Sequence, residues 1–514
     1  MVPVTVILIY IVVASFLVYT FRNKKPLKWS DFFLNGFPML KVIKNDNIYC
    51  IPGPLRLPFI GTKWQQIKMN KLHEYYADLN KTYGNIVMEM NGNIPVISLF
   101  KREDIEKVLQ FNSAYPFRPP TEIVSFYRQK HPERYSSLGL VNEQGPQWAK
   151  LRSKLTPKTL ESKRMLSTFC PELNEICDEF INAIKQKRNA NNVLENFDDL
   201  MKMMSLEASS SLILGRRMGY LQESGENNEN FMELGNAAKN IFAIFRDAFY
   251  GNCLWKYFPS RIYKEYAANE EKIYNIILEI IKNTIQNNEF MAQDKENESI
   301  LVKILKTEGL DIRDKISGVI DFLTATQVLS HTAIFLLSFI SSNAEVQEKI
   351  FQESSLLSEN PSLDELNKAH YTRAAIQESF RISPSAFAVA RILEQDFNLS
   401  EYHVEAGNIV LCHNMIACNN EENFENAKEF IPERWLNENG EMNPNQPTNS
   451  SIVVPFGCGR RTCPGKKLSE MELVILVIKL VREFKIEYMS PCEQQFEFVL
   501  APRGPINIKF ENRV

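Results

Sequence analysis

The sequence predicts a mainly α-helical protein with a minor β component, and three observations favour that class. Apolar residues recur with the helical period between Leu473 and Phe484, at intervals of four, three and four residues, which marks a buried helix face. No repeat with the period of a solenoid is visible. Strand-like stretches are short and lie at residues 96–100, 408–412 and 506–510. Polar runs at residues 222–230, 286–298 and 437–451 indicate loops.

Composition and charge narrow the class of protein. The chain of 514 residues has 59 Lys and Arg against 62 Asp and Glu, a net charge of −3, which argues against a nucleic-acid-binding protein. With 44% hydrophobic and 24% charged residues it can bury a large core. Nine cysteines without a CxxC pair indicate neither a disulfide scaffold nor structural zinc. We therefore expect a globular protein with reduced thiols.

The N-terminus predicts a membrane anchor. Residues 1–21 contain no charged side chain, and a helix of that length spans about 30 Å, the thickness of a bilayer core. A cleaved signal peptide is the alternative, but the apolar run exceeds the usual ~7–15 residues and no basic segment precedes it. Basic residues follow at 22, 24, 25 and 28, which places the rest of the chain on the cytoplasmic side and favours the endoplasmic reticulum.

Three parts of the chain follow from this pattern. Residues 1–21 form the anchor, residues 22–58 a basic linker that ends in a proline-rich hinge, and residues 59–514 one large domain. The hinge contains three prolines between Pro52 and Pro58, and prolines at that density exclude a helix.

The strongest chemical signal is the glycine-rich stretch of residues 455–465, PFGCGRRTCPG. A phosphate-binding loop is the first alternative, but a GxGxxG motif beginning at Gly457 would need glycine in place of Thr462. The preceding apolar run, residues 452–454, is also too short for the strand that such a motif follows. The spacing does suit a thiolate ligand to haem iron.

Cys463 is the predicted ligand. Gly457 and Gly459 allow a tight turn that brings backbone N–H groups toward the sulfur. Pro464 fits the first turn of a helix that continues through Leu480, so the cysteine lies at a helix N-terminus, where an anion is stabilised. A coordinating thiol is deprotonated outright.

Neighbouring residues fit the same interpretation. Gly465 removes a side chain where a porphyrin would lie, Phe456 can cover the sulfur, and Arg461 can pair with a haem propionate. The alternative is a buried cysteine in a glycine-rich turn, and for Cys458 we prefer that interpretation.

This stretch carries a family resemblance. Residues 456–465 match, at every fixed position, the Phe-x-x-Gly-x-Arg-x-Cys-x-Gly signature of the cytochrome P450 haem-thiolate monooxygenases. The resemblance extends from about residue 50 to the C-terminus. It implies the cytochrome P450 fold, a helical domain plus a small β-rich region, with haem b (iron protoporphyrin IX) as cofactor and dioxygen as co-substrate.

Further motifs of the family occur in the expected order. Glu378 and Arg381 resemble the Glu-x-x-Arg pair of its K helix, and Arg434 resembles the arginine that completes an ion triad. The same spacing alone is commonly a solvated surface pair. Trp148 and Arg152 resemble a pair that binds a propionate, and the resemblance makes Arg391 a further propionate contact.

The predicted distal helix, residues 311–342, departs from the family pattern. Ala325 fits, but Thr326 replaces a glycine, and Val328 and Leu329 replace the acid and the alcohol that relay protons in the family. We favour Ser330 and Thr326 as substitutes because residues four apart share a helix face. The alternative is that both hydroxyls bond back to their own backbone. We expect the adjacent histidine to be a packing or surface residue.

Residues 117–122, 135–145 and 385–391 resemble the mitochondrial clan of the family. That resemblance implies an adrenodoxin-like ferredoxin as electron donor and the mitochondrial inner membrane as location. Lys466 and Lys467 stand where the clan has two basic docking residues, although an exposed lysine pair is usually only solubilising. The N-terminal anchor instead favours NADPH-cytochrome P450 reductase as donor.

The resemblance implies hydroxylation of a polyhydroxylated steroid at an unactivated carbon. By family position the pocket is lined by residues 117–123, 242–249, 325–329 and 385–389 and by Leu500. These segments are largely apolar with a few hydroxyls, which also suits a fatty acid or a xenobiotic. Two further functions fit the same fold: a dioxygen-independent peroxide isomerase or dehydratase, and a haem-containing sterol-binding protein without turnover.

Overall fold

The computed structural model describes residues 69–513 except 92–93, 157–161, 223–227, 251–252, 287–298, 444 and 446. It also describes residues 42–44, 47–49, 51–55 and 61–62. The predicted anchor and most of the predicted linker lie outside the described residues. The chain divides into two compact units, and each is described by itself. The smaller contains residues 1–111, 117–119 and 388–413, and the larger contains residues 112–116, 120–387 and 414–514.

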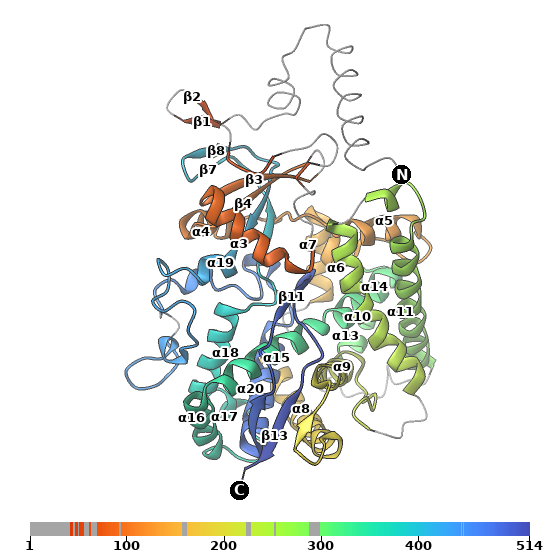
Figure 1. Cartoon of the computed structure of the whole chain (residues 1–514). Helices are drawn as coiled ribbons and strands as arrows, with labels where there is room; N and C mark the ends of the chain where they lie inside the picture. The colour runs from red at the N-terminus through yellow and green to blue at the C-terminus, as the bar shows by residue number, and fades with distance from the viewer. Residues whose placement is uncertain are drawn as a thin grey trace, which may run out of the picture. The chain divides into compact units, whose positions relative to one another are not determined.

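The smaller unit is built on a four-stranded sheet in the order β3-β4-β9-β6 (Figure 1). Strands β4 and β9 are parallel and the other neighbours antiparallel, so the predicted strands at residues 96–100 and 408–412 are confirmed and lie side by side. The strands are β3 (Ile86–Asn91), β4 (Ile94–Leu99), β6 (Val389–Ile392) and β9 (Ile409–Cys412). Two further hairpins pair β1 (Val42–Lys44) with β2 (Asn47–Tyr49) and β7 (Phe397–Leu399) with β8 (Tyr402–Val404). The helices are η2 (Met69–Lys71), α3 (Leu72–Tyr83) and α4 (Arg102–Leu109).

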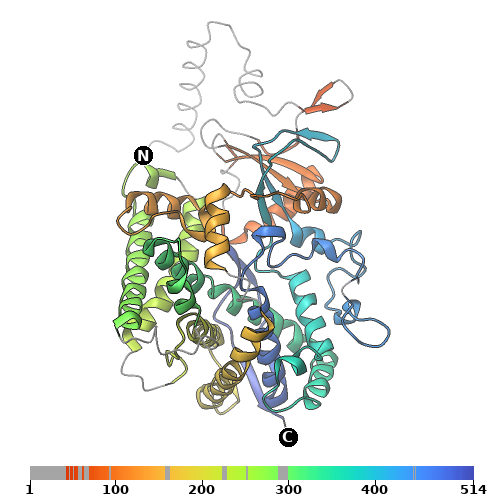
Figure 2. The same ribbon diagram turned by 180° about the vertical axis from the view of Figure 1, so that it is seen from behind.

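The larger unit is mainly helical, as predicted (Figures 1 and 2). Its first helices are α5 (Glu122–Lys130), α6 (Gly139–Asn142), α7 (Gly145–Leu155), α8 (Lys163–Lys187), α9 (Phe197–Leu214), α10 (Asn228–Tyr250), α11 (Arg261–Gln286) and α13 (Ile300–Lys306). They are followed by α14 (Ile312–Thr324), α15 (Gln327–Ser342), α16 (Ala344–Ser355), α17 (Leu363–Leu366), α18 (His370–Ile382), α19 (Asn414–Cys418) and α20 (Lys466–Glu483). Short 3₁₀ turns are η4 (Cys253–Lys256), η5 (Pro432–Trp435), η6 (Ser450–Ile452) and η7 (Gly459–Arg461).

The strands of the larger unit form two small sheets. In the first, β13 (Ile508–Asn512) pairs with β10 (Phe484–Tyr488) and with β5 (Val193–Leu194), which confirms the third predicted strand. In the second, β11 (Gln494–Glu497) and β12 (Val499–Pro502) form a hairpin.

Two apolar clusters hold the larger unit together. One is centred on α15 and α20 and includes side chains of α8, α16 and α18; the other surrounds α11 and α14 and includes α10 and α13. Helix α9 contributes to both clusters. The predicted buried face of α20 is confirmed. The buried surface is wider than predicted, because residues 471–481 are buried on all sides of the helix.

The predicted distal helix is divided in two. Asp311 caps the start of α14, accepting a hydrogen bond from the backbone N–H of Arg313 at 2.8 Å, and the helix ends at Thr324. Helix α15 begins at Gln327, and no side chain caps its N-terminus. Within the described residues, 312–342 is the one helical stretch long and apolar enough to cross a membrane, but 67% of its most apolar window is buried, as in a core helix.

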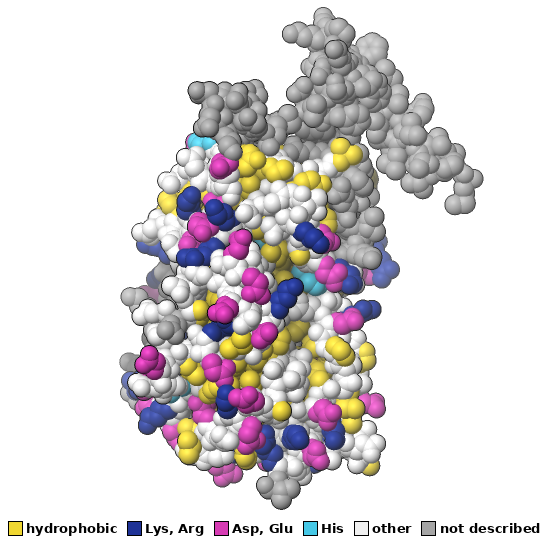
Figure 3. All heavy atoms as spheres, turned by 60° about the vertical axis from the view of Figure 1, so that its left-hand side comes forward, with side chains coloured by type: hydrophobic (Ala, Val, Ile, Leu, Met, Phe, Trp, Pro, Cys, Tyr) yellow, Lys and Arg dark blue, Asp and Glu magenta, His cyan; other side chains and the backbone are white. Residues whose placement is uncertain are grey.

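The charged surface is mixed. On the face that Figure 3 shows, Lys and Arg side chains alternate with Asp and Glu side chains over the described part of the chain. This distribution agrees with the net charge of −3.

Candidate functional site

Cys463 lies in the loop between η7 and α20. Gly457 and Gly459 have φ angles of +70° and +64°, the left-handed region that favours glycine, and they turn the loop back on itself. The backbone N–H of Cys463 donates to the carbonyl oxygen of Phe456 at 2.8 Å, which closes the turn. The cysteine residue is partly exposed.

The helix begins later than predicted. Gly465 is the N-cap of α20 and Lys466 its first residue, so Pro464 lies in the turn before the helix rather than in its first turn. A Cβ atom built on Gly465 would lie 3.8 Å from the Sγ atom of Cys463. That distance is an ordinary van der Waals contact, and the role of Gly465 in making room for a porphyrin stays a prediction.

Arg461 joins the loop to α7. Its Nε donates to the carbonyl oxygen of Pro116 at 2.9 Å, and its Nη2 donates to the carbonyl oxygen of Glu143 at 2.9 Å and to Oε1 of Gln144 at 3.0 Å. The guanidinium lies 3.8 Å from the ring centre of Trp148, which is 3% exposed. The predicted site residues Trp148 and Arg461 are thus in contact.

Arg152, one turn further along α7, reaches the same loop. Its Nη2 donates to the carbonyl oxygen of Thr462 at 2.8 Å, directly before Cys463. The structure therefore brings Trp148, Arg152 and Arg461 together beside the cysteine. Arg391 lies on β6 of the smaller unit and is described only within that unit.

The predicted ion triad is present and buried. Arg381 Nε and Nη2 each lie 2.9 Å from an oxygen of Glu378, and Arg434 Nε lies 2.9 Å from Oε1 of Glu378. Neither Glu378 nor Arg381 has an exposed side chain. Trp435, which is not among the predicted site residues, donates its indole N–H to Glu378 Oε2 at 2.9 Å. The carboxylate thus has donors on both oxygens.

Arg381 also organises the chain that precedes the cysteine loop. Its Nη1 donates to the carbonyl oxygens of Cys418 at 2.8 Å and Ala427 at 2.6 Å, and its Nη2 donates to that of Glu429 at 3.0 Å. On α18 the ring of Phe380 packs edge-on against Phe456 at 5.3 Å between centres. The triad therefore supports the segment that carries the predicted ligand.

The hydroxyls predicted as proton donors bond to backbone carbonyl oxygens three residues earlier. Thr326 Oγ1 donates to the carbonyl oxygen of Leu323 at 2.9 Å, and Ser330 Oγ donates to that of Gln327 at 2.8 Å. Ser330 is fully buried. Both hydroxyls thus bond back to the backbone, as one of the two interpretations of the sequence predicts, and a catalytic role for them stays a prediction.

The open face of the helix lies elsewhere. Ala325 is exposed, and Val328 and Leu329 are partly exposed, although most of the residues around them are buried. At 100° per residue, Thr332 shares this face, one turn after Val328 and Leu329. Its Oγ1 donates to the carbonyl oxygen of Val328 at 3.0 Å and lies 2.8 Å from Ser385 Oγ. Thr332 is not among the predicted site residues. Its position four residues after Val328, on the same helix face, was the signal in the sequence that could have identified it.

His331 is a buried residue of α15. It is 6% exposed, and burial lowers the pKa of its imidazole to about 3. The ring is therefore neutral at physiological pH, and its packing role is as expected.

The two predicted docking lysines are exposed at the start of α20. Lys466 Nζ lies 3.9 Å from Glu470 Oε1, and the Lys466 side chain is 47% exposed. A surface pair of this kind contributes little to stability. Both lysines are accessible to a protein partner close to Cys463 in the chain.

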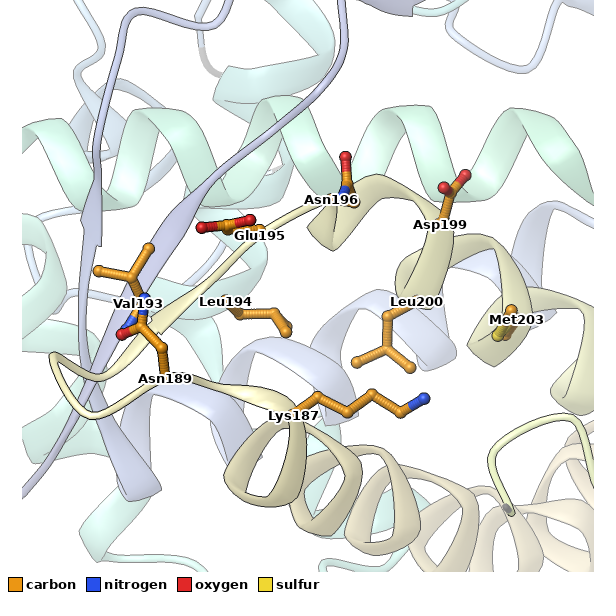
Figure 4. Close-up of a pocket in the computed structure, with 9 residues that line it drawn as sticks. All are labelled: Lys187, Asn189, Val193, Leu194, Glu195, Asn196, Asp199, Leu200 and Met203. Atoms are coloured by element: carbon orange, nitrogen blue, oxygen red, sulfur yellow. The ribbon is translucent and has the colours of Figure 1, made fainter. Parts of the chain in front are cut away.

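A separate surface cavity of about 370 Å³ lies where α8, β5 and α9 meet (Figure 4). It is lined by Lys187, Asn189, Val193, Leu194, Glu195, Asn196, Asp199, Leu200 and Met203. None of the predicted site residues lines it, so it does not belong to the candidate site.

The donor set fits a haem. A partly exposed thiol stands two residues before the N-cap of a buried helix, and α7 places an arginine and a tryptophan beside Arg461 of the same loop. Guanidinium groups are the side chains best suited to carboxylates such as propionates. The fold and this loop define a haem-thiolate enzyme.

Comparison with known proteins gives the family. Residues 51–510 match the model of the family described as Cytochrome P450, and the chain belongs to the cytochrome P450 family. It is 46% identical over 482 residues to ecdysone 20-monooxygenase of Drosophila melanogaster, covering 91% of this chain and 89% of that protein.

More distant relatives belong to the same family. The chain is 28% identical to "Cytochrome P450 302a1, mitochondrial" of Drosophila melanogaster, covering 85% of this chain and 89% of the relative. It is also 28% identical to "Probable cytochrome P450 12a5, mitochondrial" of the same organism, covering 91% and 90%. The protein is thus a monooxygenase, and its family implies a haem-thiolate cofactor and a redox partner.

Proposed function

We propose that this monooxygenase hydroxylates ecdysone at position 20. The observation that carries the proposal is the 46% identity, over 91% of the chain, to a relative named ecdysone 20-monooxygenase. The structure adds a hydroxyl pair, Thr332 and Ser385, beside the open face of α15, and a polar pair in apolar surroundings suits a steroid that carries hydroxyl groups.

We assign the haem contacts to the residues around the cysteine loop. Cys463 would hold the iron through its sulfur, and Gly465 and Phe456 would lie close to the bound group. Arg461, Trp148 and Arg152 of the larger unit would bind propionates, and the family resemblance adds Arg391. A haem bound in this way, with a thiolate ligand, would activate dioxygen.

The protein's own groups position the steroid and hold protons. Val328 and Leu329 present apolar surface to the substrate, and neither side chain can donate a proton. Thr332 Oγ1 is the hydroxyl on the same face, and its contact with Ser385 Oγ lets either oxygen donate while the other accepts.

We assign electron delivery to a ferredoxin. Five relatives, including the two that are 28% identical above, carry the word mitochondrial in their names, which supports a mitochondrial membrane location rather than the endoplasmic reticulum. The exposed Lys466 and Lys467 provide positive charge for an acidic donor protein.

Reconstitution tests both assignments. The haem-loaded protein is supplied with NADPH and ecdysone, once with adrenodoxin and its reductase and once with NADPH-cytochrome P450 reductase, and the products are identified by mass spectrometry. We expect 20-hydroxyecdysone with the ferredoxin system. Turnover with the flavoprotein reductase alone would refute the ferredoxin assignment, and unchanged ecdysone with both donors would refute the substrate.

A further inference from the structure

A buried ion pair joins three helices of the larger unit. Arg128 on α5 has a side chain that is 2% exposed, and its Nη2 lies 2.8 Å from Asp321 Oδ1 on α14 and 3.3 Å from Glu270 Oε1 on α11. Its Nη1 donates to the carbonyl oxygen of Leu138 at 3.0 Å. Both carboxylates are also buried. The guanidinium therefore connects α5 to α11, to α14 and to the turn before α6.

The two carboxylates have further donors. Tyr135 donates its hydroxyl to Glu270 Oε1 at 3.0 Å, and the backbone N–H of Val141 donates to Asp321 Oδ2 at 3.4 Å. Burial, followed by the charge of Glu270, raises the pKa of the Tyr135 phenol, so it stays protonated and remains a donor. Two carboxylates beside one guanidinium are thus stabilised without solvent.

The start of α6 is shaped around these three charged groups. Gly139 has a φ of +83°, which favours glycine. A Cβ atom there would lie 1.9 Å from Arg128 Nη1 and 2.7 Å from Asp321 Oδ2. Glycine is therefore needed both for the backbone conformation and for the space that the guanidinium occupies.

Asp321 stands one turn before the break in the distal helix. Across that break the N–H groups of Val328 and Leu329 donate to the carbonyl oxygens three residues earlier, at 3.3 and 3.1 Å, rather than four residues earlier. The regular α-helical ladder therefore does not continue from α14 into α15. Contacts from other elements must then hold the end of α14 in place.

We propose that Arg128 is a positioning residue for the hydroxylation. By holding Asp321 it fixes where α14 ends, and hence where residues 325–329 lie against the substrate. It also fixes α5, whose first residues belong to the segment predicted to line the pocket. This inference takes its substrate from the proposed function. The claim that Arg128 fixes the end of α14 does not depend on the steroid.

The test compares Arg128→Lys, Arg128→Met and Asp321→Asn with wild type as haem-loaded enzymes. Arg134→Met is the matched control, because Arg134 pairs with Glu271 on the same helix α11 at 3.0 Å but at the surface. Haem content, kcat, KM and the positions hydroxylated are measured per haem with ecdysone. Hydrogen exchange of the backbone amides of residues 322–329 is measured without steroid.

We expect Arg128→Met and Asp321→Asn to lower kcat by roughly tenfold or more, since small misplacements near a reacting centre cost up to about a hundredfold. The product should spread over more than one carbon, and amides 322–329 should exchange at least about tenfold faster. Arg128→Lys keeps the charge and should restore part of both losses. Arg134→Met should match wild type.

A purely structural role would lower the yield of haem-loaded protein and leave the product pattern per haem unchanged. A lower yield with an unchanged product pattern would overturn the proposal. Unchanged hydrogen exchange of residues 322–329 in Arg128→Lys and Asp321→Asn would overturn it as well, even where Arg128→Met fails to fold. Wild-type enzyme that leaves ecdysone unaltered would refute the proposed substrate alone, because the exchange experiment does not use it.

Discussion

The Oγ1 atom of Thr332 lies 2.8 Å from the Oγ atom of Ser385, which joins helix α15 to the segment that follows α18. Both residues are buried, at 7% and 5% exposure. The backbone of Ser385 is held as well, because its carbonyl oxygen accepts the N–H of Leu500 at 2.8 Å from the hairpin of β11 and β12. The distal helix and two of the predicted pocket walls, at Ser385 and Leu500, therefore meet at this hydroxyl pair.

We expect Thr332→Val to reduce the fraction of electrons that end in hydroxylated product by severalfold. Val328 and Leu329 cannot donate protons, and Thr332 is the hydroxyl on their face of the helix. The measurement is product formed per NADPH consumed. Ser330→Ala is the matched control, because Ser330 is fully buried and lies outside the face that carries Val328, Leu329 and Thr332. If Ser330→Ala lowers the product formed per NADPH and Thr332→Val does not, the proton-donating hydroxyl is Ser330, as the sequence predicts, and not Thr332.

The buried triad makes a second prediction, about assembly. Arg381→Ala leaves Glu378 charged and buried with fewer partners and frees three carbonyl oxygens, a cost of about 3–5 kcal/mol. We expect little haem-loaded protein, read from the reduced CO-difference spectrum per mole of chain. Arg261→Ala is the control. The Arg261 side chain is 89% exposed and pairs with Glu265 at the surface, so its removal should leave haem loading unchanged. Normal haem content in Arg381→Ala would show that the triad is dispensable.

What the sequence predicted well is local or tied to a motif. The glycine turn before Cys463, the Glu378 and Arg381 pair three residues apart and the Trp148 and Arg152 pair on one helix all depend on short spacings. The contacts that it missed join distant parts of the chain: Arg128 and Asp321 are separated by 193 residues.

The distal hydroxyls show the same limit. Helical spacing could group Thr326 with Ser330, but it could not indicate which face of the helix would be open. That choice depends on the packing of α15 against neighbours such as Ser385, which lies 53 residues beyond Thr332. The break after Thr324 was missed because residues 321–330 contain no proline or glycine to signal it.

The exposed lysines at the start of α20 predict an electrostatic step in electron transfer. We expect Lys466→Glu with Lys467→Glu to raise the KM for ferredoxin by about tenfold or more at low salt, because like charges oppose docking. The effect should shrink as ionic strength rises. Steroid affinity, measured by titration without the donor protein, should not change. A salt-independent loss, or an equal loss of steroid binding, would point to damage at the cysteine loop rather than to docking.

Glu472 makes the stability of the core depend on pH. The residue lies on α20 at 1% exposure, and burial raises the pKa of its carboxyl from 4.5 to about 8. The folded protein therefore keeps a proton that the unfolded chain releases, so the stability contributed by this group is present below pH 4.5 and is lost as the pH rises toward 8. The slope is about 1.4 kcal/mol per pH unit within that window.

Glu472→Gln stays neutral at every pH and should remove that slope. We expect the variant to match wild type near pH 4.5, where the wild-type carboxyl is protonated in the folded state and half protonated in the unfolded chain, and to unfold at a higher temperature than wild type near pH 8. Thermal unfolding of the haem-loaded protein across this range measures the difference. Glu438→Gln at an exposed site is the control and should follow the wild-type curve. Parallel curves for wild type and Glu472→Gln would mean that the carboxylate is stabilised in the folded core.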